Sequence, residues 1–120
     1  MTTTSDKPVL FSCSGCSNVA QAANSVAVSL NLEGKVEMSC TAGLAVGVKA
    51  HVRKATSGRP VIAVDGCEIA CVRASLDKLS VSPHAHVVAT DLGIRKRTGE
   101  LCPDEDIRTL RDDVEKVLPG

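Results

Sequence analysis

Four short apolar segments alternate along the chain with segments whose apolar residues recur at helical spacing. The strand-like segments cover residues 7–12, 35–40, 60–65 and 86–90, and the helical ones residues 17–32, 44–55, 67–79 and 103–117. Strands that alternate with helices are typical of an α/β fold with a parallel sheet covered by helices on both faces. Because crossovers between parallel strands are right-handed, few topologies remain. We predict a four-stranded, flavodoxin-like or half-Rossmann sheet with strand order 2-1-3-4.

The length and composition fit one domain and exclude several functions. The 120 residues suit a single domain, predicted over residues 8–120 after a disordered tail of residues 1–7. The 14 basic and 14 acidic residues leave no net charge to attract nucleic acid or an anionic membrane, and Phe11 is the single aromatic residue. The basic run at residues 95–97 is interpreted as a solvated loop. No apolar run approaches the roughly 20 residues of a membrane span, and residues 1–7 lack a signal-peptide core. We therefore expect a cytoplasmic protein.

Five of the six cysteines follow predicted strands. They occur as a C-x-x-C pair after the first strand, a single cysteine after the second and a pair after the third: Cys13, Cys16, Cys40, Cys67 and Cys71. In an open parallel sheet, ligands bind beyond the carboxyl ends of the strands, where the strand order switches. Neighbouring strands lie only about 4.8 Å apart. The sequence therefore predicts that these five thiols meet in one site.

The local spacing also suits thiolate chemistry. Both cysteine pairs precede helices, and a helix N-terminus stabilises a thiolate. If Cys67 opens the third helix, Cys71 lies one turn further on the same face. Asp65 and Asp91 follow strands at the same edge. They are predicted to hold the site residues in position without binding the metal, although capping of loops explains both residues equally well. His51, His84 and His86 are expected to stay outside the site. Cys102 is more simply explained as a free loop cysteine, but its loop lies at the same edge and could bring it to the site.

The residues alone leave three kinds of site open. A reducing compartment disfavours a disulfide framework and favours metal or redox roles for clustered cysteines. Four cysteines fit tetrahedral zinc and an iron–sulfur cluster equally well. A redox or sulfur-transfer protein would instead use Cys13 and Cys16 directly. The chain has neither a phosphate-binding P-loop nor a dinucleotide-binding glycine motif.

Four ordered motifs resemble a known family. They are CSGCSNVAQAAN from residue 13, MSCTAG from residue 38, VDGCEIAC from residue 64 and VVATDLGI from residue 87. They are similar to those of the bacterial and archaeal DGC-domain proteins, named for an Asp-Gly-Cys stretch that here is Asp65-Gly66-Cys67. The resemblance spans about residues 8–97 and implies a zinc-binding α/β domain whose ligands come from the same five cysteines.

The prediction that follows is a zinc protein without catalytic activity, acting as a metal carrier or accessory protein. Five candidate ligands for four coordination positions leave one thiol, Cys40 by spacing, for exchange or reactivity. The expected partners are the metal ion and an unidentified protein, with no nucleic acid and no membrane. The iron–sulfur protein and the thiol-based redox protein remain the alternatives.

Overall fold

The computed structural model describes residues 7–120, so residues 1–6 of the predicted tail lie outside the described part. Lys7 is held in place, because its carbonyl accepts hydrogen bonds from the Arg59 guanidinium at 2.9 and 3.0 Å. None of the helices in residues 7–120 is both long and apolar enough to cross a membrane. The elements in chain order are β1 (Val9–Ser12), α1 (Asn18–Leu32), β2 (Glu37–Ser39), α2 (Thr41–Ala45), α3 (Lys49–Ala55), β3 (Val61–Asp65), α4 (Cys71–Asp77), β4 (Ala85–Val88), the 3₁₀ helix η2 (Ala89–Leu92) and α5 (Asp104–Lys116).

The four strands form one parallel sheet in the order β2-β1-β3-β4, which confirms the predicted topology. Strand β1 pairs with β2 and β3, with Leu10 opposite Met38 on one side and Ile62 on the other. All four carboxyl ends therefore lie along one edge of the sheet, with the ends of β1, β2 and β3 adjacent.

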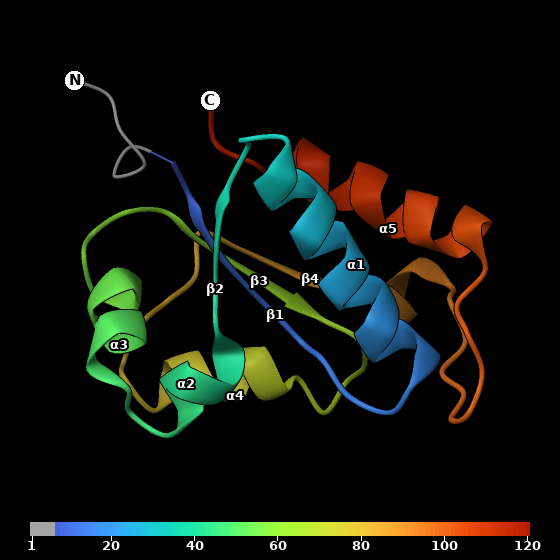
Figure 1. Ribbon diagram of the computed structural model, residues 1–120, viewed down its shortest axis with the longest axis horizontal. Coiled ribbons are helices and arrows are strands. Elements are labelled where there is room, and N and C mark those ends of the chain that lie inside the picture. Colours follow the sequence, from blue (N-terminus) through green and yellow to red (C-terminus); the bar gives the residue numbers. More distant parts are fainter. Residues whose placement is uncertain (1–6) are drawn as a thin grey trace.

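Helices cover both faces of the sheet, with α1 and α5 on one side and α2, α3 and α4 on the other (Figure 1). The alternation of side chains along each strand divides the core between these two layers. Leu10, Ile62 and Val64 pack with α1 and α5, whereas Val9 and Phe11 pack with the shorter helices. The apolar runs of β1 and β3 are thus buried on both faces, as central parallel strands require.

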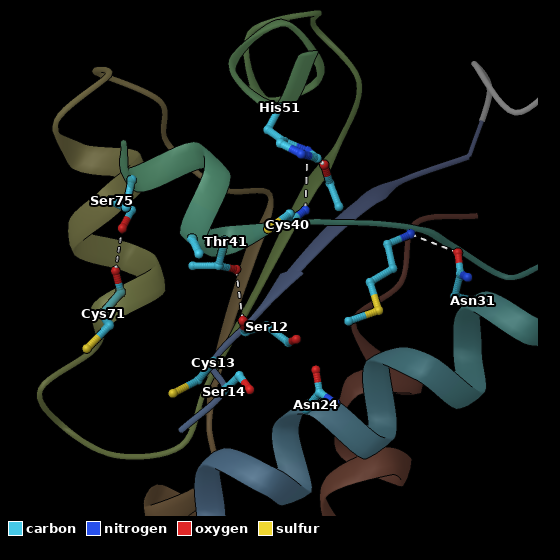
Figure 2. Close-up of a pocket in the computed structure, with 14 residues that line it drawn as sticks. Ser12, Cys13, Ser14, Asn24, Asn31, Cys40, Thr41, His51, Cys71 and Ser75 are labelled. Atoms are coloured by element: carbon cyan, nitrogen blue, oxygen red, sulfur yellow. Dashed lines mark hydrogen bonds between the residues drawn. The ribbon is translucent and has the colours of Figure 1, made fainter. Parts of the chain in front are cut away.

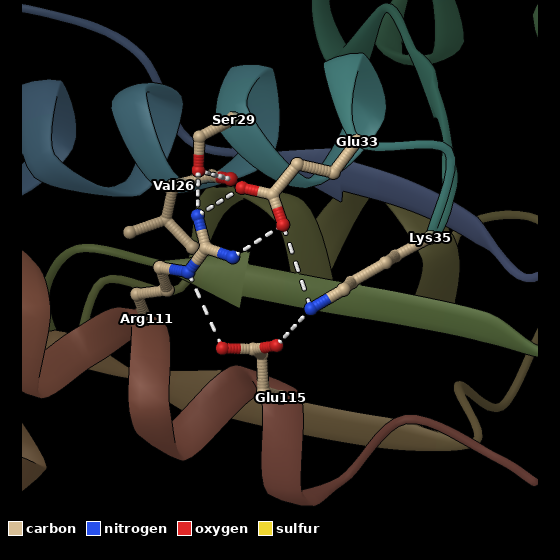
Figure 3. A network of polar contacts seen from close by, with 6 residues as sticks. All are labelled: Val26, Ser29, Glu33, Lys35, Arg111 and Glu115. Carbon is tan, nitrogen blue, oxygen red and sulfur yellow. Dashed lines mark hydrogen bonds and ion pairs between the residues drawn. The ribbon is translucent and has the colours of Figure 1, made fainter.

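An ion-pair network joins α5 to the end of α1 and to the segment before β2 (Figure 3). The Arg111 guanidinium donates to both carboxylate oxygens of Glu33, at 2.6 and 2.7 Å, and to Ser29 Oγ. Lys35 pairs with Glu33 and Glu115. The hydrogen bond with Arg111 is the largest influence on Glu33 and lowers its pKa to about 2.

The predicted second helix is broken in two. The break falls at Gly47, which adopts a left-handed backbone with φ of 83° that glycine accommodates without strain. The Val48 N–H then donates to the Gly43 carbonyl at 2.8 Å, and α3 begins at Lys49. The chain consequently turns back, so that His51 of α3 lies over Gly43 of α2.

The third helix begins four residues later than predicted. Residues 67–70 form a turn closed by the Ala70 N–H and the Cys67 carbonyl at 3.0 Å. Ala70 has a left-handed backbone with φ of 53°, which redirects the chain into α4 at Cys71. Ile69, which a helix over residues 67–79 would place on its inner face, is 64% exposed. Cys67 and Cys71 therefore do not share a helix face.

The fourth strand is earlier and shorter than predicted. It covers Ala85–Val88, and Ala89–Leu92 form a 3₁₀ helix. His86, the first residue of the predicted strand, therefore lies inside β4, where its Nε2 contacts Asp65 Oδ2 at 2.8 Å.

Candidate functional site

The five predicted site cysteines lie at the carboxyl edge of the sheet, on three loops. Cys13 follows β1 directly, and Cys16 precedes Ser17, whose side chain caps α1. Cys40 is the N-terminal cap of α2, directly after β2. Cys67 lies in the turn after β3, and Cys71 is the first residue of α4. Cys13 and Cys67 are partly buried, whereas Cys16, Cys40 and Cys71 are exposed.

Asp65 fixes the loop that carries the second cysteine pair. Its carboxylate is 1% exposed and accepts hydrogen bonds from the N–H groups of Val72 and Arg73, at 2.8 and 3.2 Å. Its second oxygen also contacts His86 Nε2 at 2.8 Å. The carboxylate thus caps the first turn of α4 from the end of β3, which holds Cys71 in place.

Gly66 allows the same loop to approach α1. A Cβ atom at this position would lie 2.9 Å from the Ala20 nitrogen and 2.9 Å from the Val19 carbonyl carbon, both in the helix backbone. These distances exclude any side chain unless the helix or the loop moves. The close approach brings the loop after β3 next to the loop after β1, and thereby Cys67 next to Cys13.

Electrostatic interactions connect the thiols of these two loops. Burial raises the pKa of Cys13, a hydrogen bond from the Gly66 backbone opposes this effect, and the nearby charges of Asp65, Cys71 and Cys67 raise the pKa further. Lys96 Nζ lies 3.4 Å from Cys67 Sγ. Cys16 also interacts with Lys96 and contributes to raising the Lys96 pKa, after the larger effects of Cys67 and Glu68. We call Cys13, Cys16, Cys67 and Cys71 the thiol cluster.

A cavity of about 740 Å³ opens beside the thiol cluster, and its lining includes Cys13, Cys40, Cys71 and His51 (Figure 2). Its other lining residues are small, polar or apolar, and none carries a fixed charge: Ser12, Ser14, Asn24, Asn31, Met38, Ser39, Thr41, Ala42, Ala45 and Ser75. The size falls in the usual range for small-molecule pockets.

Cys40 stands apart from the thiol cluster within this cavity. Thr41 lies between Cys40 and the end of β1, because its hydroxyl donates to the Ser12 carbonyl at 2.8 Å. The Cys40 sulfur accepts from the Gly43 N–H at 3.3 Å, so it is directed at its own helix α2. Figure 2 shows Cys13 and Cys71 projecting to the same side, with Cys40 beyond Thr41.

His51, which was expected to stay outside the site, lines this cavity. Its Nδ1 contacts Ser39 Oγ at 2.7 Å and accepts from the Cys40 N–H at 3.4 Å. A Cβ on Gly43 would collide with the His51 ring, whose Nε2 would be 3.1 Å away. Gly47 could have predicted this position, because a helix break at that glycine turns α3 back toward the end of β2.

Asp91 and Cys102 both lie between β4 and α5. Asp91 is exposed in η2, and no hydrogen bond of its side chain is found among residues 7–120. Cys102 is 9% exposed and packs in the apolar core with Leu110 and Val114. Burial raises the pKa of the Cys102 thiol. Cys102 therefore behaves as a core residue and not as an exposed loop thiol.

The donors have the right chemistry for a soft metal ion but are not closed around one. Thiolates are preferred ligands of zinc and of iron–sulfur clusters. Among residues 7–120, however, no three His, Cys, Asp or Glu side chains converge closely enough to hold a metal ion. Binding by the thiol cluster would require rotation of side chains, and the exposed Cys16 and Cys71 have the freedom for it.

The DGC domain family profile matches residues 9–114. The chain belongs to the DGC domain family. It is also 44% identical over 114 residues to the Pseudomonas aeruginosa protein called anaerobic and virulence modulator AnvM, an alignment that covers 94% of this chain and 87% of the relative. No solved structure matches the chain significantly.

Proposed function

We propose that this DGC-domain protein binds a soft divalent metal ion, zinc, through the thiol cluster. The observation that supports the proposal is that Asp65 and Gly66 hold the loop after β3 against α1, so that its cysteines lie near those of the loop after β1. A bound zinc ion would hold the two loops together and keep the thiolates unprotonated. Cys40 is the fifth thiol and lies outside this set.

The biological role that fits is a metal carrier or an accessory protein. A zinc ion held by four thiolates has no open position for a water molecule, so the site is not expected to be catalytic. The similar AnvM protein is called a modulator. We accordingly propose that metal binding controls an interaction with another protein, in the cytoplasm, where thiols stay reduced.

The test is the metal content of the protein purified anaerobically, together with three single variants. We expect a colourless protein with about one zinc per chain, as a four-thiolate site implies. Cys67→Ser should lose the metal, whereas Cys40→Ser and the buried control Cys102→Ser should keep it. If Cys67→Ser and Cys102→Ser lost equal amounts of bound metal, the assignment of Cys67 as a ligand would be wrong.

The same preparation separates the two alternatives. A brown protein containing iron and acid-labile sulfide would show that the site holds an iron–sulfur cluster and not zinc. A metal-free protein that forms a reversible Cys13–Cys16 disulfide would instead support a thiol-based redox or sulfur-transfer function. That alternative draws on the exposure of Cys16 and its position before the N-terminus of α1.

A further inference from the structure

The charged loop that follows η2 is fastened to the start of α1 by a buried asparagine. Asn18 is 3% exposed, and its side-chain amide donates to the Arg95 carbonyl at 2.8 Å. Its side-chain carbonyl accepts from the Arg97 N–H at 2.6 Å, and its own backbone N–H donates to the Arg97 carbonyl at 2.9 Å. An isolated antiparallel bridge joins Ser17 to Thr98. The backbone of this loop is therefore fixed, although its side chains are exposed.

Fixing the backbone on both sides of Lys96 places its ammonium group beside Cys67 of the thiol cluster. Lys96 Nζ lies 3.4 Å from Cys67 Sγ, within reach of a hydrogen bond to sulfur. Cys16, which comes from the other loop, is a smaller contributor to the raised pKa of Lys96. Lys96 thus contacts the thiol cluster through Cys67.

The other two cations of the loop are engaged differently. The Arg97 guanidinium pairs with Glu100 at 3.2 Å, and both arginines line a separate hollow beside Pro103. Within residues 7–120, Lys96 is the member of the basic run with a contact to a cysteine sulfur. The run is therefore more than the solvated loop that the sequence indicated.

We infer that Lys96 is the counter-charge of the thiol cluster and favours a complex in which four thiolates hold one divalent ion. This inference rests on the proposed function. Four thiolates around a divalent ion carry a net charge of about −2, whereas three carry about −1, so a fixed neighbouring cation stabilises the four-thiolate complex more. Lys96 acts through the sulfur atoms and is a positioning residue, not a ligand.

The test compares the zinc affinity of four proteins by competition with a chromophoric chelator, at low and at high salt. Lys96→Gln should weaken zinc binding about tenfold at low salt, the usual effect of losing one hydrogen bond to a charged group. Lys96→Arg should retain most of the affinity. Lys78→Gln removes the same charge at the far end of α4 and should stay within about twofold. The difference in zinc affinity between the wild type and Lys96→Gln should be smaller at high salt, because salt screens partly exposed charges.

A double-mutant cycle tests whether Asn18 acts by holding Lys96 in place. Asn18→Ala should weaken zinc binding, and adding Lys96→Gln should cause little further loss, because both changes remove the same contact. Circular dichroism of each variant confirms that it is folded. Additive losses would refute the role of Asn18.

The outcomes separate this inference from the proposed function. If the wild-type protein binds no zinc, the proposed function fails and the role of Lys96 fails with it. If the wild type binds zinc but Lys96→Gln binds as tightly as Lys78→Gln, only the counter-charge role is overturned.

Discussion

Replacing Asp65 with alanine should destabilise the fold more than any other single change at the site. The carboxylate is 1% exposed and accepts from the N–H groups of Val72 and Arg73 and pairs with His86. Alanine would leave the first turn of α4 uncapped and His86 without its partner. Asp65→Ala would therefore disturb the fold and the position of Cys71 together.

The magnitude follows from what each partner can do after the carboxylate is lost. Val72 is fully buried, so its N–H would find no other hydrogen-bond acceptor, and an unpaired buried N–H costs about 1–3 kcal/mol. Arg73 is partly exposed and the His86 side chain is 21% exposed, so water can partly replace these two bonds. Together the loss should be about 3 kcal/mol, within the range for broken buried networks. For a domain of this size it corresponds to a decrease of about 12 °C in the melting temperature.

Urea unfolding followed by circular dichroism measures this change in the free energy of unfolding. Asp65→Asn keeps an oxygen for one N–H group and should lose about half as much, roughly 1.5 kcal/mol. Asp91→Ala is the matched control, because Asp91 is exposed, and it should change stability by less than about 0.5 kcal/mol. If Asp65→Ala behaved like Asp91→Ala, the account of Asp65 as the cap of α4 would be wrong.

Three further predictions concern backbone geometry and charge. Gly66→Ala should lower the free energy of unfolding by about 1–3 kcal/mol, because the added Cβ meets the backbone of α1. Gly43→Ala should lower it less, because the His51 ring can turn away. Thermal unfolding that ranks the two variants the other way would contradict this explanation. Ala70→Gly and Ser80→Gly should each stabilise the fold by about 0.5 kcal/mol in urea unfolding, since both residues have a left-handed backbone that glycine adopts without strain. If both variants were less stable than the wild type, the left-handed backbone would not be a source of strain. The Glu33 pKa lies at about 2 in the folded protein, below its ordinary 4.5, so the stability that Glu33 provides is complete above pH 4.5 and is lost as the pH falls toward 2. Glu33→Gln should flatten the decrease of the urea midpoint in that pH window, and an unchanged slope would exclude the ion pair with Arg111 as its cause.

The alternation of strands and helices was sufficient to predict the sheet and its strand order. Handedness leaves few arrangements once the elements are known, and β1 and β3 carry the unbroken apolar runs of central strands. The start of α4 was predicted wrongly because helical periodicity continues through residues 67–70. What ends it there is the left-handed backbone of Ala70, a residue type that gives no signal for that conformation.

The positions of the five cysteines along the sheet edge could be predicted, but not their arrangement relative to one another. Five cysteines at strand ends must lie along one edge of a parallel sheet, and they do. The distances between them depend on contacts from distant parts of the sequence, such as Gly66 against α1 and Asn18 against residue 95. The position of His51 depended on the turn at Gly47, and that of Lys96 on a buried asparagine 78 residues earlier in the chain.

The Asp-Gly-Cys stretch joins these contacts in three consecutive residues, each with a different physical task. Asp65 anchors the start of α4 and with it Cys71, Gly66 permits the approach to α1 that brings the loop to Cys13, and Cys67 contacts Lys96. Changing the first two residues should disturb the arrangement of the thiols even though neither supplies a sulfur. Asp65→Asn and Gly66→Ala should therefore weaken zinc binding in variants that remain folded, whereas Cys40→Ser, which removes a sulfur outside the thiol cluster, should leave zinc affinity unchanged.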